Sequence, residues 1–278
     1  METIFRQNNQ LCSKNTTQAY STSFSLGVRV LSKEYRHHIY NIYGFVRYAD
    51  EIVDTFLKYD RKLLLQEFRE DTFKAMERGI SMNPILDSFQ YTVNACKIDH
   101  ELIHSFLHSM EMDLTMEEYN KNELATYIYG SAEVVGLMCL RVFYVDDDQE
   151  YERLKYSARK LGEAFQKVNF LRDAQDDFEG KGRIYFNNID FANFTPSAKH
   201  QIEQEIQHDF DEAFAGIITL KPQVRLGVYT AYRYYLELFK KIKKAQPKAI
   251  LQERFRVSNS MKGLLMFKAT LRNYANLF

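Results

Sequence analysis

The chain has 278 residues, enough for one large domain or two small ones, and 45% of them are hydrophobic. Its 37 basic residues balance its 37 acidic residues, so the composition gives no support for a dedicated nucleic-acid-binding protein. Only four prolines and 11 glycines interrupt the chain, which favours long helices over many strands and turns.

Short runs that contain proline, glycine or aspartate divide the chain into segments whose apolar residues recur every three or four positions, as in helices. The sequence shows no extended strand-like alternation, no repeat and no low-complexity tract. We therefore expect one all-α domain over residues 1–278. The predicted helices span residues 14–27, 33–57, 61–77, 84–96, 99–111, 122–144, 149–178, 196–217, 222–244 and 259–275.

The helix expected over residues 33–57 carries a polar stripe. At 100° per residue, a hydroxyl, a guanidinium and two carboxylates fall within about 60° of one another, flanked by apolar residues. These residues are Tyr43, Arg47, Asp50 and Asp54. Carboxylates four residues apart are also common on solvent-exposed helix faces, so a surface ion network is the alternative interpretation.

A second stripe lies on the helix expected over residues 149–178. Four polar side chains cluster within about 80°, and Arg172 flanks them. They are Gln166, Asn169, Asp173 and Asp177. Like charges four residues apart destabilise a helix, so two such faces indicate a compensating cation. The run Asp146–Asp148 is a further acidic cluster, which we interpret as a helix N-cap rather than a metal site.

Magnesium suits these two stripes best, with Mn²⁺ as the alternative. It takes oxygen ligands, retains water and completes its shell with substrate phosphates. Neither helix supplies a full cage, but two facing helices can hold ions together with a diphosphate. Such ions, with Arg and Tyr donors, would stabilise a departing diphosphate, and an apolar aromatic cavity would protect the resulting carbocation.

Both stripes, in their flanking context, resemble motifs of the squalene/phytoene synthase family. Within that family the resemblance is strongest to the bacterial phytoene synthases. The first has the form Tyr-x-x-x-Arg-x-x-Asp-x-x-x-Asp, and the second has the form Asn-x-x-x-Asp-x-x-x-Asp with an arginine before the first aspartate. Weaker resemblances cover most of residues 15–265. They are a serine-bearing segment (residues 20–24), a tyrosine-bearing helix (127–130), a Gly-Arg-Ile-Tyr-Phe ending (182–186) and a basic C-terminal element (256–258).

The resemblance implies an isoprenoid synthase helical bundle with a central cavity, in which two prenyl diphosphates couple head to head through a cyclopropyl diphosphate. It implies catalytic roles for Tyr129, Tyr43 and Arg47, and metal ligation by Asp50, Asp54, Asn169, Asp173 and Asp177. It implies substrate contacts from Ser21, Ser23, Phe24, Tyr43, Arg47, Gln166, Asn169, Arg172, Arg183, Tyr185 and Arg256. Tyr129 as a core residue is the alternative.

One departure from the family pattern is Glu133, where a small residue is usual. It would be exposed or paired with a cation at a helix end. The preferred reaction is coupling of two geranylgeranyl diphosphates to phytoene, without NADPH. The alternatives are coupling of two farnesyl diphosphates to squalene or dehydrosqualene, a cyclising terpene synthase, and a non-catalytic assembly factor; intact aspartates argue against the last.

Three scattered cysteines and an N-terminus without an apolar signal core favour a cytoplasmic protein. We expect a monomer or weak homodimer, with prenyl diphosphates as partners, no nucleic acid, and peripheral contact with the inner face of the membrane for product release. The basic segment Lys240–Lys248 is interpreted as a solvated helix end, with lipid binding as the alternative.

Overall fold

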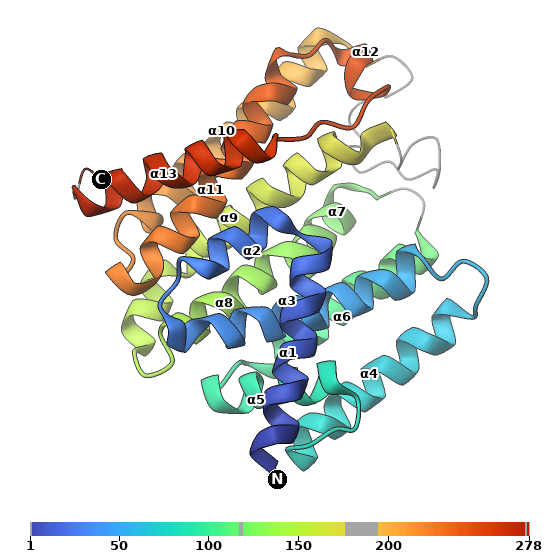
Figure 1. Cartoon of the computed structure of the whole chain (residues 1–278). Coiled ribbons are helices and arrows are strands. Elements are labelled where there is room, and N and C mark those ends of the chain that lie inside the picture. Colours follow the sequence, from blue (N-terminus) through green and yellow to red (C-terminus); the bar gives the residue numbers. More distant parts are fainter. Residues whose placement is uncertain (1, 117–118, 176–193, 276, 278) are drawn as a thin grey trace.

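The structure, a computed structural model, describes residues 2–116, 119–175, 194–275 and 277. These residues form helices and no strand, which confirms the expected all-α class (Figure 1). The helices are α1 (Glu2–Tyr20), α2 (Thr22–Arg29), α3 (Lys33–Asp54), α4 (Arg61–Arg78), α5 (Pro84–Cys96), α6 (His100–Thr115), α7 (Lys121–Ile128), the π-helix η1 (Tyr129–Glu133), α8 (Val134–Phe143), α9 (Asp148–Gln175), α10 (Pro196–Ile217), α11 (Pro222–Lys244), α12 (Pro247–Ile250) and α13 (Asn259–Tyr274).

The N-terminal region differs from the prediction of one helix over residues 14–27. Helix α1 begins twelve residues earlier, and α2 is a separate helix whose N-cap, Ser21, accepts a hydrogen bond from the Phe24 amide at 3.2 Å. The buried residues of α1 are polar: Asn9, Ser13 and Thr17. Asn9 donates to a carboxylate on α5 at 2.9 Å, so α1 is held by polar packing that an apolar pattern does not reveal.

The helix boundaries elsewhere follow local capping chemistry. Asn83 and Thr195 cap α5 and α10, each before a proline in the first turn. Asp147 accepts a hydrogen bond from the Glu150 amide at 3.0 Å at the start of α9, which confirms the N-cap interpretation of that acidic run. The helix predicted over residues 122–144 is continuous in direction but contains the π-helical turn η1 between α7 and α8.

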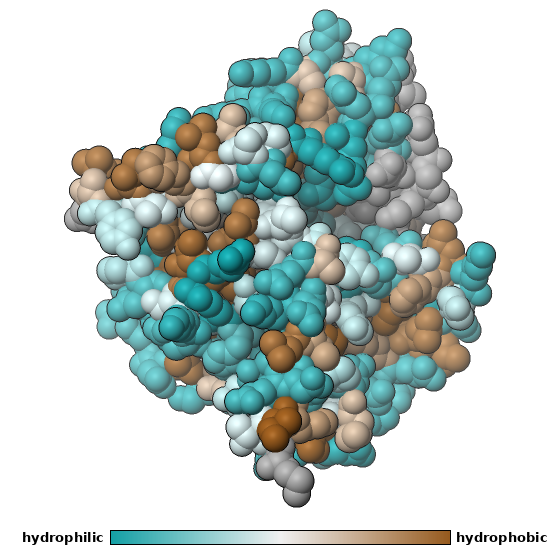
Figure 2. Space-filling view, in the orientation of Figure 1, coloured by the Kyte–Doolittle hydropathy of each residue, from teal (hydrophilic) through white to brown (hydrophobic). Residues whose placement is uncertain are grey.

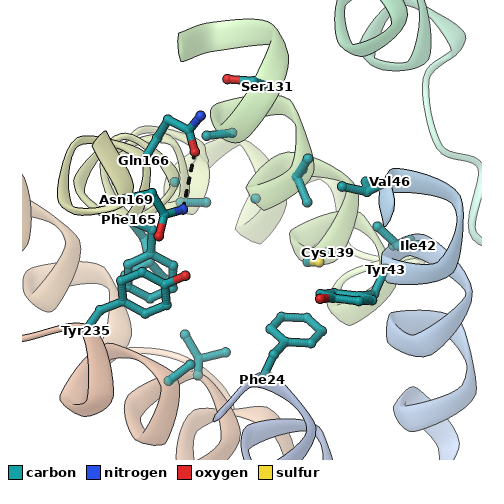
Figure 3. Close-up of a pocket in the computed structure, with 18 of the residues that line it drawn as sticks. Phe24, Ile42, Tyr43, Val46, Ser131, Cys139, Phe165, Gln166, Asn169 and Tyr235 are labelled. Carbon is teal, nitrogen blue, oxygen red and sulfur yellow. Dashed lines mark hydrogen bonds between the residues drawn. The ribbon is translucent and has the colours of Figure 1, made fainter. Parts of the chain in front are cut away.

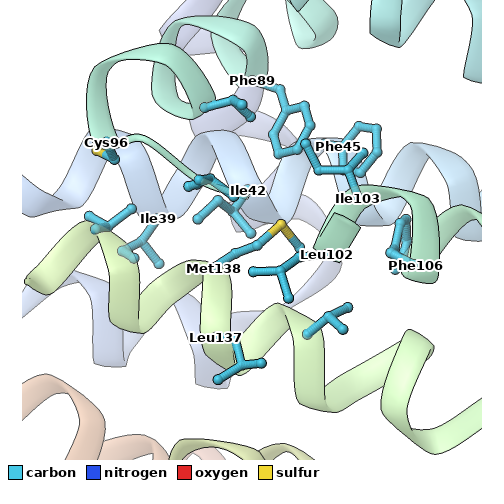
Figure 4. Close-up of a cluster of buried hydrophobic side chains, with 14 of the residues drawn as sticks. Ile39, Ile42, Phe45, Phe89, Cys96, Leu102, Ile103, Phe106, Leu137 and Met138 are labelled. Carbon is cyan, nitrogen blue, oxygen red and sulfur yellow. The ribbon is translucent and has the colours of Figure 1, made fainter. Parts of the chain in front are cut away.

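Buried apolar side chains form two clusters. The first joins α3, α5, α6 and α8, with Phe45 stacked on Phe89 at 3.8 Å between ring centroids (Figure 4). The second joins α9, α10 and α11 around Phe210, which meets Tyr232 edge-on at 5.5 Å. None of the described helices is both long and apolar enough to cross a bilayer.

Candidate active site

A cavity of about 630 Å³ opens among α2, α3, α6, α7, α8, α9, α10 and α11, together with η1. Figure 3 shows its walls: α3 faces α9 across the space, η1 and α8 form a third side, and α2 and α11 lie opposite them. Most of the lining is apolar or aromatic. Polar side chains come chiefly from the two stripes that the sequence predicts.

The first stripe lies on the cavity side of α3, where Tyr43, Arg47, Asp50 and Asp54 all line the wall. Arg47 Nη1 donates to Asp50 Oδ2 at 2.8 Å, and its other terminal nitrogen pairs with Glu51. The ion network of the alternative interpretation therefore exists, but it borders the cavity instead of facing solvent alone. Its arginine is positioned to exchange these partners for an anionic ligand.

Tyr43 contributes a neutral hydroxyl to this wall. Its ring stacks on Phe24 at 5.0 Å between centroids, and both rings face the cavity (Figure 3). Burial raises the pKa of Tyr43 to about 12, and the positive charge of Arg47 only partly opposes this. At neutral pH Tyr43 is therefore a hydrogen-bond donor, not a phenolate.

The second stripe faces the same cavity from α9, with Gln166, Asn169 and Asp173 on the lining. Asn169 Nδ2 donates to Gln166 Oε1 at 3.4 Å (Figure 3). Asn169 Oδ1 is buried and accepts no hydrogen bond from any residue that the structure describes. A buried acceptor without a donor is costly, so this oxygen is suited to a ligand or cation. Asp177, the stripe's last predicted member, lies outside the described residues.

Two arginines hold Asp173. Arg172 forms hydrogen bonds of 3.0 and 2.5 Å with the two carboxylate oxygens, and Arg254 Nε lies 2.9 Å from Oδ1. Burial disfavours the charge of Arg172, but hydrogen bonding to Asp173 and Tyr235 raises its pKa overall. Arg254 was not predicted. The sequence analysis chose Arg256, whose exposed side chain does not line the cavity.

Tyr235 of α11 connects the two stripes. Its ring stacks on Phe165 at 3.8 Å, and both rings line the cavity (Figure 3). Its phenol helps to raise the pKa of Arg172 on α9 and contributes to the raised pKa of Tyr43 on α3. The stripes on α3 and α9 therefore share one polar neighbourhood beside an aromatic wall.

Of the two tyrosines in the segment 127–130, the one that faces the cavity is Tyr127, not Tyr129. Tyr127 lines the cavity and donates a 3.0 Å hydrogen bond to Asp113, which also lines it. Tyr129 is absent from the lining and lies beneath the guanidinium of Arg159, 5.3 Å from its ring centroid. Residues two apart on a helix point about 200° from one another, so only one of this pair can face the cavity.

Glu133, the departure from the family pattern, is buried between η1 and α9 and forms an ion pair there. Its carboxylate accepts from Arg159 Nε of α9 at 2.5 Å and does not line the cavity. Burial raises the pKa of Glu133 despite this arginine. The expected exposure is therefore wrong and the pairing with a cation is confirmed, although Arg159 lies within α9 and not at a helix end; Glu133 does not line the cavity.

The predicted serine contacts are not part of the cavity wall. Ser21 caps α2, and Ser23 is half-buried on that helix; neither lines the cavity, whereas Phe24 does. Two further predicted substrate contacts, Arg183 and Tyr185, lie outside the described residues.

The cavity offers a small set of oxygen ligands to a divalent cation. Among the residues described, no three acidic, histidine or cysteine side chains converge closely enough to hold a metal ion. The oxygens that could bind a cation at the cavity wall are the carboxylates of Asp50, Asp54 and Asp173 and the amide oxygen of Asn169. All are hard donors in small number, which fits Mg²⁺ because this ion usually takes one or two carboxylates plus water and phosphate oxygens.

Comparison with known proteins identifies the family of the chain. Residues 17–261 match the squalene/phytoene synthase family. The chain is 27% identical to a phytoene synthase of Arthrospira platensis over 84% of both chains, and 31% identical to a presqualene diphosphate synthase of Sinorhizobium fredii over 66% of this chain and 65% of that protein.

The fold is likewise similar to that of a crystallised dehydrosqualene synthase, with a TM-score of 0.80, 20% identity and 98% coverage of both chains. That likeness concerns the arrangement of helices alone. The family match covers most of the chain, including the polar stripes on α3 and α9 as far as Asp173. The protein belongs to the squalene/phytoene synthase family, whose members are prenyltransferases that condense prenyl diphosphates head to head.

Proposed function

We propose that the protein couples two molecules of geranylgeranyl diphosphate head to head, through a cyclopropyl diphosphate intermediate, to give phytoene and diphosphate. The observation that carries this proposal is the placement of both polar stripes, from α3 and α9, on one cavity whose other walls are apolar and aromatic. The polar stripes can stabilise the charge of a leaving diphosphate, and the apolar and aromatic walls can shield a carbocation from water.

The cationic and hydroxyl donors of the cavity would bind the leaving diphosphate. Arg47 on one wall and Arg172 and Arg254 on the other each pair with an aspartate of the stripes. A diphosphate entering between them would replace carboxylate partners with phosphate oxygens, and Tyr43 would donate its proton as a further hydrogen bond. Mg²⁺, bound through Asp50, Asp54, Asn169 and Asp173, would supply additional neutralisation of the diphosphate charge.

The apolar part of the cavity would hold the prenyl chains and shield the carbocations from water. Phe24 and Tyr43 form one aromatic surface, and Phe165 and Tyr235 form another. The faces of such rings attract cations, which supports a stabilising role for them. We assign to Tyr127 the hydroxyl role that the sequence analysis gave to Tyr129, because Tyr127 lines the cavity and Asp113 orients its phenol.

The choice of C20 substrates rests on the relatives. A bacterial phytoene synthase matches 84% of the chain, and three plant phytoene synthases, each 27% identical, match about four fifths of it. Coupling of two C15 chains is the second candidate. It is favoured by the 31% identity to the Sinorhizobium presqualene diphosphate synthase and by a 4,4'-diapophytoene synthase of Staphylococcus haemolyticus at 26%.

Incubation of the purified protein with Mg²⁺ and either geranylgeranyl or farnesyl diphosphate, with and without NADPH, tests the proposal. We expect a C40 hydrocarbon and diphosphate from the C20 substrate, with no dependence on NADPH. Product from the C15 substrate alone would replace the proposal with the second candidate. Failure of both substrates to release diphosphate would contradict prenyl coupling altogether.

A further inference from the structure

The outer face of α13 is apolar, although this helix lies on the molecular surface. Its buried residues are Leu265 and Ala269; Ala269 belongs to the second apolar cluster, and α13 packs against α11. The opposite face points away from the protein, and Figure 2 shows apolar side chains along it towards the C-terminus. These side chains are Leu264, Phe267, Leu271 and Tyr274, which are 43%, 59%, 54% and 83% exposed.

These four residues, which we call the α13 stripe, form one continuous strip. At 100° per residue they fall within about 80° of one another, whereas an ordinary surface helix carries polar residues on that side. Exposure of single apolar residues is normal, but a row of four large ones over eleven positions indicates a binding surface.

The surroundings of the α13 stripe are strongly basic. Residues 240–274, which run from the end of α11 through α12 and α13, contain ten lysine or arginine residues and one acidic residue, Glu253. The whole chain is neutral, so the remainder carries a compensating negative excess. Helix α13 itself contains no acidic residue, and Lys268 is exposed beside the stripe. This combination of an apolar face with basic flanks is complementary to an anionic membrane surface.

The α13 stripe is also close in the chain to the candidate active site. Arg254, which lines the cavity and pairs with Asp173, lies four residues before the N-cap of α13, Ser258. Helix α11 presents Val228 and Tyr235 to the cavity and packs against α13. A surface bound by the α13 stripe would therefore be separated from the α11 wall of the cavity by α13 alone.

We propose that α13 docks the protein on an anionic lipid bilayer, with Leu264, Phe267 and Leu271 inserted into the headgroup region and the neighbouring basic residues contacting anionic lipids. The choice of a bilayer over another protein rests on the proposed function, whose substrates and product carry long hydrocarbon chains. A second copy of this chain fits less well, because two such surfaces would bring two basic regions together.

Co-sedimentation with liposomes, without substrate or Mg²⁺, tests this proposal independently of catalysis. Vesicles of phosphatidylcholine are compared with vesicles containing 30% phosphatidylglycerol. The stripe variant combines Leu264→Gln, Phe267→Gln and Leu271→Gln, and Phe267→Gln alone serves if the triple variant is unstable. The control variant replaces three apolar residues that are 70%, 51% and 84% exposed and lie in α1 and just before α5, away from α13 (Figure 1): Ile4→Gln, Leu11→Gln and Met82→Gln.

We expect the unmodified protein to bind the anionic vesicles, and 0.5 M NaCl to weaken the binding. The stripe variant should bind at least about tenfold more weakly, because three apolar side chains no longer enter the bilayer. The control variant should bind within twofold of the unmodified protein. Turnover of detergent-dispersed substrate should be equal in all three, since none of the substituted residues lines the cavity.

Absence of binding to anionic vesicles, or equal binding by the stripe variant, would overturn the proposal. The proposal would also be overturned if the protein bound no vesicles but formed dimers, and if the sedimentation coefficient fell only in the stripe variant. That result would identify a second copy of the chain as the occupant of the α13 stripe. Vesicle binding by a protein that couples no prenyl diphosphate would leave the docking surface intact and refute only the proposed function.

Discussion

The most specific prediction concerns Arg254, because the sequence predicted a substrate contact from Arg256, two positions away. Arg254 Nε lies 2.9 Å from Asp173 Oδ1, with the side chains 45% and 21% exposed. An ion pair this accessible contributes only about 0.2–1 kcal/mol to stability, and Asp173 retains Arg172. The substitution Arg254→Ala should therefore lower the melting temperature by no more than about 4 °C.

The effect on catalysis should be much larger. If Arg254 donates a charge-assisted hydrogen bond to the diphosphate, its loss costs about 1.5–3 kcal/mol, or roughly 10- to 150-fold in kcat/KM. The substitution also removes a cation that competes for Asp173, so the Mg²⁺ concentration for half-maximal rate should not rise. Loss of a residue with a purely structural role would not lower kcat/KM while leaving the Mg²⁺ concentration for half-maximal rate unchanged.

Continuous measurement of diphosphate release under saturating Mg²⁺, with each prenyl diphosphate varied, provides the assay. The matched control is Arg256→Ala. That side chain is exposed and absent from the cavity wall, and its backbone carbonyl keeps the hydrogen bond from Lys241. We expect kcat/KM of the control within about twofold of the unmodified protein. Equal losses in both variants, or a loss confined to Arg256→Ala, would refute the assignment.

Three further predictions concern the cavity wall and the helix packing. Asp113→Asn leaves one fewer acceptor for two buried phenols, one of them Tyr127, and should cost about 1–3 kcal/mol in urea unfolding; an unchanged midpoint would contradict this. Burial raises the pKa of Cys139 to about 12, so in a variant lacking the other cysteines this thiol should resist Ellman's reagent at pH 8 and react only at strongly alkaline pH; rapid labelling at pH 8 would disprove it. Gly216→Ala places a Cβ 2.3 Å from a side-chain carbon of α9 and should destabilise by about 1–3 kcal/mol, whereas Gly263→Ala, with no atom within 4 Å, should stabilise by up to about 1 kcal/mol; equal melting temperatures would refute the packing argument.

The two polar stripes could be predicted because helical periodicity alone determines which residues share a face. Tyr43, Arg47, Asp50 and Asp54 all line the cavity, as 100° per residue requires. The same periodicity could not determine which of the two tyrosines, Tyr127 or Tyr129, faces the cavity. Tyr129 begins a π-helical turn, where the backbone is wound differently, and the choice between it and Tyr127 depends on the packing of η1 against α6 and α9.

The remaining differences have tertiary causes. Helix α1 was predicted to begin too late because its buried face is polar: Asn9 and Thr17 donate side-chain hydrogen bonds, and Ser13 packs closely against Gly44 of α3. Arg254 reaches Asp173 across 81 positions of sequence, and no local pattern encodes that approach. The exposed stripe of α13 was also missed, since an apolar face in a sequence normally predicts burial.

The central claim is that the stripes on α3 and α9 act together on one diphosphate, and the Mg²⁺-dependent turnover of two isosteric variants tests it most directly. Asp50→Asn and Asp173→Asn should each lower kcat at least about 100-fold, because each removes one charge that would help hold the metal and diphosphate. Asp146→Asn, in the exposed acidic run before α9, should leave the rate unchanged. Wild-type turnover by either stripe variant would contradict the account.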